Sequence, residues 1–143
     1  MRHHADPSII ERGVEKAHVW LKEAADELGT DDRLQAYRVL RAMLHAIRDR
    51  LRIDSAAELA AQLPTLGRGI YCEDWKPART PLPIHDVGGF LGDVADAGPV
   101  VGSPDASLAV EVVVRVLRRH VSEGEVDDVV AVLPEPLKPL ISV

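Results

Sequence analysis

Apolar residues recur along most of the chain at spacings of three and four positions, which line one face of an α-helix. The first such stripe begins at Ile10 and reaches Leu28, with charged residues on the other faces, and it predicts a helix over 8–28. Gly29 suits the left-handed residue that ends a helix. Thr30-Asp31-Asp32 then offers an N-cap and negative charge for the next helix start.

The second stripe predicts a helix that ends near Arg52, and its members are Tyr37, Leu40, Leu44, Ile47 and Leu51. After this helix, Ser55 and Glu58 have the spacing of a capping box, so we expect a short helix to begin there and to reach Leu63. Pro64 suits the first position of a further helical turn, because a first-turn amide needs no helical partner.

Residues 72–85 contain three prolines, and we predict an extended linker around Trp75. A helix near 86–96 is expected beyond the linker, although Gly88, Gly89 and Gly92 weaken it.

The last third of the chain predicts two more helices. Ser103-Pro104-Asp105 combines an N-cap with a first-position proline. The valine-rich run that follows is too long for an ordinary strand and breaks strand alternation, so a helix to Val121 is favoured. Ser122 and Glu125 then form a capping box for a helix to about Leu133.

The chain also resembles itself at an offset of about 70 positions, where Leu63-Pro64 meets Leu133-Pro134 and Leu51 meets Val121. We therefore predict an all-α bundle of about six helices, built from two related helix-turn-helix halves that are joined by a Pro-rich linker. The predicted single domain covers 1–143, with a frayed start over 1–8, a first half over about 9–72, the linker over about 72–85 and a second half over about 86–141.

The paired cap and core residues of the two halves resemble a bacterial family of unknown function, the DUF2267 family. They are Ser122-Glu123-Gly124-Glu125, Asp128, Leu133-Pro134 and Leu137 in the second half, and Arg50-Leu51, Glu58, Gln62-Leu63-Pro64 and Arg68 in the first. The resemblance implies an all-helical, small, soluble bacterial protein with no assigned activity and no catalytic residues. The glycine-interrupted segment 86–96 departs from the family's usual pattern.

Composition limits the compartment and the class of ligand. Aromatics make up only 3% of the 143 residues, so the core must be built from small aliphatic side chains. Cys72 is the only cysteine, and no apolar run is long enough for a membrane span, so we expect a cytoplasmic protein without a membrane segment. The net charge of −6 opposes binding to nucleic acid.

The sequence contains no motif for phosphate binding or for a serine nucleophile. Glu15 with His18, and His45 with Asp49, lie on single helical faces, but neither pair has the further ligands that a metal site needs. We expect a half-buried structural Cys72, since the following Glu73 and Asp74 disfavour its thiolate. No cofactor, metal or catalytic residue is predicted.

The most organised polar feature is a basic ridge, formed by Arg38, Arg41, His45, Arg48 and Arg52 beside the apolar stripe of the second helix. We favour pairing of the ridge with carboxylates of the fold or of a second copy; binding to an anion or nucleic acid is the alternative. Trp75 either anchors a partner or folds back on the bundle.

These observations favour a non-enzymatic interaction or regulatory module that binds a protein partner or itself, as in a homodimer. Two alternatives stay open. One is anion or nucleic-acid binding through the basic ridge, and the other is an enzyme with a pocket inside the bundle.

Overall fold

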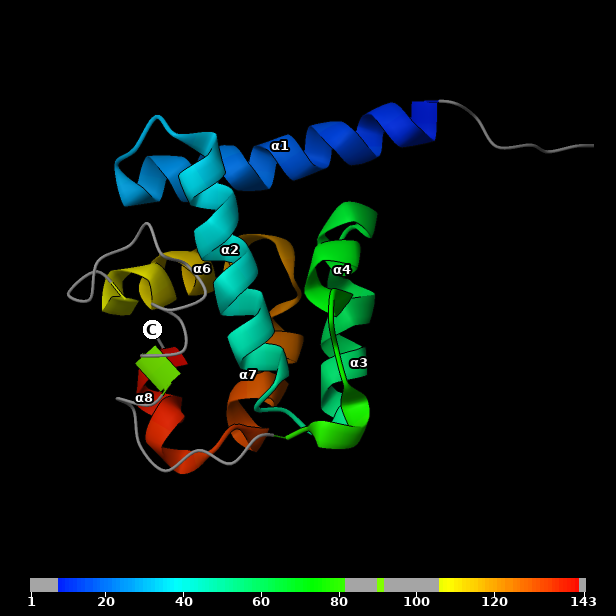
Figure 1. The fold of residues 1–143 in the computed structure, drawn as a ribbon, viewed down its shortest axis with the longest axis vertical. Helices are drawn as coiled ribbons and strands as arrows, with labels where there is room; N and C mark the ends of the chain where they lie inside the picture. Colours follow the sequence, from blue (N-terminus) through cyan, green and yellow to red (C-terminus); the bar gives the residue numbers. More distant parts are fainter. Residues whose placement is uncertain (1–7, 82–89, 92–105, 142–143) are drawn as a thin grey trace, which may run out of the picture.

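The computed structural model describes residues 8–81, 90–91 and 106–141, and these residues contain helices and no strand (Figure 1). The predicted all-α fold is therefore confirmed. The α-helices are α1 (Ser8–Leu28), α2 (Arg33–Arg48), α3 (Ile53–Gln62), α4 (Thr65–Cys72), α6 (Ala106–His120), α7 (Glu123–Val132) and α8 (Lys138–Ile141). Short 3-10 turns cover Pro77–Arg79 and Glu135–Leu137.

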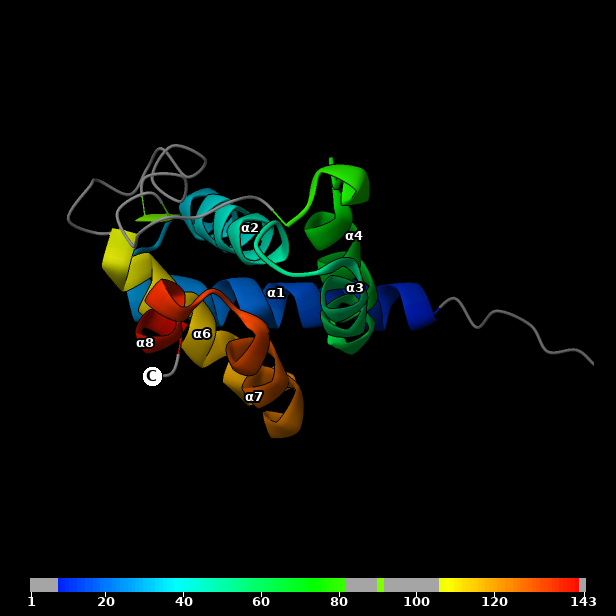
Figure 2. The same cartoon turned by 90° about the horizontal axis from the view of Figure 1, so that it is seen from below.

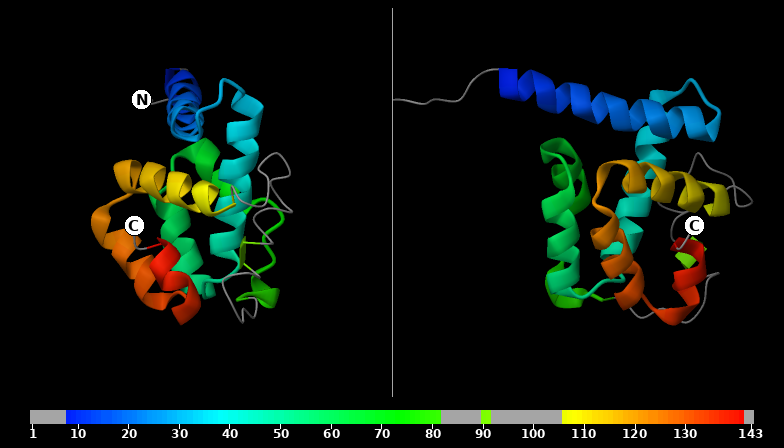
Figure 3. Two further views of the ribbon diagram at one scale, coloured as in Figure 1. Left: turned by 90° about the vertical axis from the view of Figure 1, so that its left-hand side faces the viewer. Right: turned by 180° about the vertical axis from the view of Figure 1, so that it is seen from behind.

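The helices α2 and α6 form the centre of the fold. Helix α1 packs across both of them and also contacts α4, while α3 packs against α4 and α7. Figures 1 and 2 show that the N-terminal end of α1 extends beyond the other helices. The right-hand view in Figure 3 shows the same extension from behind.

The core consists mainly of small aliphatic side chains, as the composition predicts. Five valines of α6 are each at most 1% exposed, namely Val110, Val112, Val113, Val114 and Val116. Because neighbouring valines point in different directions on a helix, α6 is buried on several sides. This burial explains how a β-branched run stays helical, since tertiary packing outweighs its weak helix propensity.

Several helix ends match the sequence prediction. Gly29 has a φ of 73° after α1, and the Asp32 carboxylate accepts a hydrogen bond of 2.9 Å from the Leu34 amide at the start of α2. At the start of α7, the Ser122 hydroxyl accepts a hydrogen bond from the Glu125 amide. These side chains satisfy amides that have no partner inside the helix.

Other helix ends differ from the prediction. Helix α2 ends at Arg48 rather than Arg52, because the amide of Leu51 bonds to the carbonyl of Arg48 in a tighter turn. The predicted capping box at Ser55 is wrong, since α3 already begins at Ile53 with no side-chain cap. The burial of Leu51 and Ala56 on either side of this turn shows that packing sets the start of α3.

Pro64 precedes α4 as its N-cap residue, one position earlier than predicted. The linker region is also less extended than predicted, because Pro77–Arg79 form a helical turn. Of the expected helix near 86–96, only Phe90 and Leu91 are described, and both are helical. The predicted cap at 103–105 and most of the predicted frayed start lie outside the described residues.

Helix positions and burial recur at the offset of 70 residues. Helices α3 and α7 begin at Ile53 and Glu123 and have 10 residues each. Both Trp20 and Phe90 are buried in the core. This recurrence agrees with a duplicated unit, and the origin of the two halves by duplication stays a prediction.

The two serines of the expected capping boxes provide a matched pair for testing the helix starts. We expect Ser122→Ala to lower the free energy of unfolding by about 1 kcal/mol, because the Glu125 amide loses its acceptor. Ser55→Ala should change it by less than about 0.5 kcal/mol, because Ser55 caps nothing. Urea denaturation of both variants measures the difference, and equal losses would contradict the assigned helix starts.

Candidate functional site

The basic ridge of α2 is largely engaged with the end of α4. Arg48 is only 3% exposed, and its Nη1 donates hydrogen bonds of 2.7 Å to the carbonyl oxygens of both Tyr71 and Glu73. Its Nε donates to Oδ1 of Asp49 at 2.8 Å. The last carbonyls of a helix lack helical partners, and the Arg48 guanidinium donates hydrogen bonds to two such carbonyls at the end of α4.

Two further ridge residues bind the same segment. Arg41 Nε lies 3.1 Å from Oε1 of Glu73, and the His45 Nε2 lies 2.6 Å from the carbonyl oxygen of Ile70. Burial lowers the pKa of His45, and the positive charges of Arg48 and Arg41 lower it further. A neutral imidazole that donates from Nε2 therefore fits this site.

The remaining predicted site residues do not join this group. Arg38 and Arg52 are exposed, and Arg52 lies 3.8 Å from the Asp54 carboxylate. Trp75 is partly buried and packs against the core, with its indole nitrogen buried. The sequence thus brings Arg41 and Arg48 together at the end of α4, while Arg38 and Arg52 face solvent.

Cys72 is exposed, so the expected half-buried position is wrong. It is the last residue of α4, and the Arg48 contacts fix the backbone on both sides of it rather than its side chain.

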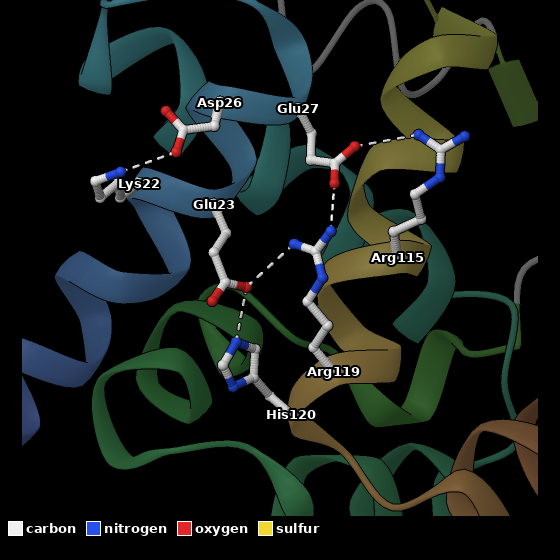
Figure 4. Close-up of polar contacts among 7 residues, drawn as sticks. All are labelled: Lys22, Glu23, Asp26, Glu27, Arg115, Arg119 and His120. Atoms are coloured by element: carbon white, nitrogen blue, oxygen red, sulfur yellow. Dashed lines mark hydrogen bonds and ion pairs between the residues drawn. The ribbon is translucent and has the colours of Figure 1, made fainter.

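A second polar group, which sequence reasoning did not identify, joins α1 to α6 (Figure 4). We call it the α1–α6 cluster: Glu23, Glu27, Arg115, Arg119 and His120. Glu23 Oε1 lies 2.9 Å from His120 Nε2 and 3.4 Å from Arg119 Nη1. Glu27 pairs with Arg119 and, at 3.2 Å, with Arg115.

The charges of this cluster are mutually compensated. The hydrogen bond from Arg119 lowers the pKa of Glu27, against a weaker opposing effect of burial. The ring of His120 stacks on Trp20 with centroids 4.8 Å apart, so an aromatic contact accompanies the ion pairs. The cluster therefore fixes the second half of α1 to the end of α6.

Chemically, the Glu23–His120 pair has the form of a carboxylate that orients an imidazole. In the described part of the chain, no serine, threonine or cysteine side chain hydrogen-bonds to His120. A nucleophile that the imidazole would activate is therefore lacking among these residues, and the geometry is that of a helix contact.

The sequence did hold a signal for the α1–α6 cluster. Glu23 and Glu27 are four residues apart on α1, and Arg115 and Arg119 are four residues apart on α6. Such spacing places each pair on one helix face, so two matching ladders of opposite charge are able to meet. Nothing in the spacing, however, tells which helices become neighbours.

Within the described residues, no group of three or more histidine, cysteine, aspartate or glutamate side chains is placed to hold a metal ion. The described helices include none that is long and apolar enough to cross a membrane.

An exposed apolar surface lies at the N-terminal end of α1. The stripe of α1 continues upstream of the packed region, where Ile9, Ile10 and Val14 are 57%, 69% and 42% exposed. We call this segment, residues 8–16, the overhang, because the N-terminal end of α1 extends beyond the other helices (Figure 3, right). Downstream of it, Trp20 and Ala24 are buried in the core.

The role of Arg48 is testable by comparison with an exposed ridge residue. We expect Arg48→Gln to lower the free energy of unfolding by about 2–4 kcal/mol, because two carbonyls and a carboxylate lose a buried donor. Arg38→Gln, at an exposed position, should change it by less than about 0.5 kcal/mol. Chemical denaturation distinguishes the two, and a small loss for Arg48→Gln would show that its contacts contribute little.

The lowered pKa of His45 predicts a pH dependence of stability. Below about pH 6.5 the unfolded chain gains a proton at this residue more readily than the folded chain does, so stability falls as the pH drops. We expect His45→Gln to show a shallower loss of stability between about pH 7.5 and pH 5.5. The exposed His18→Gln is the control, and an unchanged slope in His45→Gln would exclude this residue as the cause.

Comparison with known proteins agrees with the sequence resemblance. No curated protein matches the chain significantly. A family described as an uncharacterised conserved protein, DUF2267, matches residues 17–140 and so covers most of the chain. The chain therefore belongs to the DUF2267 family of uncharacterised conserved proteins.

Proposed function

We propose that this chain is a non-enzymatic interaction module of the bacterial cytoplasm, with a regulatory role, that binds a protein partner through the overhang of α1. The observation that carries the proposal is the exposed continuation of an apolar stripe. Along α1, Ile10 and Val14 share a face with Ala17 and Leu21, yet only the latter two pack against the fold.

A single exposed apolar residue needs no explanation, because folded proteins expose much apolar surface. Here two large side chains one turn apart lie on the same face of a projecting helix, and Ile9 lies beside them. Helices that present apolar residues at such spacing bind into grooves of partner proteins. The overhang therefore has the arrangement of a helix that binds in the groove of a partner protein.

The contacts of the basic ridge favour this proposal over binding to nucleic acid. Arg48 is buried and Arg41 pairs with Glu73, so two of the four arginines are not free to neutralise phosphate. The net charge of −6 adds a further repulsion. An enzymatic function has less support, since His120 lies in a compensated helix contact.

Photo-crosslinking tests the proposed surface in cells. A photoreactive amino acid at Val14, an exposed position of the overhang, should give a crosslinked product of defined mass. The same group at Ala57, an exposed position of α3, should give none, because α3 lies outside the proposed surface. If Val14 and Ala57 give the same products, or neither gives any, the overhang is not a binding surface.

A further inference from the structure

A small apolar pocket lies where α1 crosses α2 and α4. Its volume is about 40 Å³, and it is partly enclosed. The residues that matter here are Ala17 and Leu21 of α1, with Pro64, Gly67 and Ile70 at α4. Its wall includes Gly67, which has no side chain to occupy this space.

The second half of the chain shows which side chain fits such a place. Seventy residues after Gly67, the corresponding position holds Leu137, which is 0% exposed. A Cβ atom on Gly67 would lie 3.4 Å from Cγ of Pro64, an ordinary contact. The pocket is therefore open to an aliphatic side chain, and the first half lacks the leucine that the second half supplies.

The chain also has an exposed aliphatic side chain, Ile10, that packs in no pocket of the described fold. Ile10 is 69% exposed and lies on the face of α1 that includes Ala17 in the pocket wall. Seven residues of helix separate the two, or about 10 Å. When two copies of α1 pack antiparallel, the overhang of each runs toward the pocket of the other. This is the reciprocal arrangement of a two-fold interface.

Charge supports a second copy as the occupant. The overhang carries two acidic and two basic side chains: Glu11, Arg12, Glu15 and Lys16. Two overhangs therefore meet without net repulsion, although the whole chain has a charge of −6. Leu66, next to Gly67 in the sequence, adds exposed apolar surface to α4.

We propose that two copies of this chain form a symmetric dimer in which Ile10 of each copy enters the Gly67 pocket of the other. This inference rests on the proposed function and names the partner of the overhang. The dimer buries a small apolar contact, so it is reversible, with a dissociation constant in the micromolar to millimolar range.

Sedimentation velocity of the purified chain, up to about 1 mM, tests the dimer. The wild type should shift from monomer to dimer with concentration. Ile10→Ser should weaken the dimer at least about tenfold, because the aliphatic group is lost from the contact. Gly67→Leu should abolish the dimer, because its own side chain fills the pocket, and should raise the melting temperature.

Matched controls separate the contact from general effects. Val19→Ser changes a side chain that is 45% exposed on the opposite side of α1, and Gly69→Leu changes a glycine with open space around it; both should dimerise as the wild type does. A monomeric wild type, or equal loss in the controls, would overturn the proposal. If Gly67→Leu does not fold, the dimer is tested by Ile10→Ser alone, because a substitution at this exposed position leaves the fold intact.

The outcome also separates this inference from the proposed function. If the purified chain stays monomeric while Val14 crosslinks to a different protein in cells, the dimer is wrong and the overhang still binds a partner. If the chain is monomeric and Val14 gives no specific crosslink, both proposals fail.

Discussion

The close packing of α2 against α6 is the contact on which the rest of the fold depends. The buried residues described in these two helices include no aromatic side chain, so the helices approach each other through alanine, valine and other aliphatic groups. The large aromatics lie around this pair: Trp20 on α1, Tyr71 on α4 and Phe90. All three belong to the same buried cluster as the apolar residues of α2 and α6.

The sequence predicted the elements whose signals are local. The apolar stripes gave the helices, and Gly29 and Ser122 gave two of their ends, because a left-handed glycine and an N-cap act within a few residues. The capping box predicted at Ser55 was wrong, because α3 begins earlier, at Ile53, between the buried residues Leu51 and Ala56. A cap adds about 1 kcal/mol, and packing of two core residues outweighs it.

The candidate sites were harder to predict, because they depend on which helices become neighbours. The spacing placed Arg41 and Arg48 on one edge of α2, but their partners are carbonyls and a carboxylate more than 20 residues away. The α1–α6 cluster joins residues nearly 90 positions or more apart. Cys72 was placed wrongly for the same reason, since its neighbours in sequence do not determine its exposure.

The two polar groups act together on the apolar surface of α1. Arg48 and His45 hold the end of α4, which positions Gly67 within the same helix. The α1–α6 cluster holds the second half of α1, while the N-terminal end of α1 extends past α4. The pocket and the overhang therefore keep a fixed relation, and loss of either polar group would disturb it. The contacts of Arg41 and Arg48 with the end of α4 therefore bear on the position of this helix.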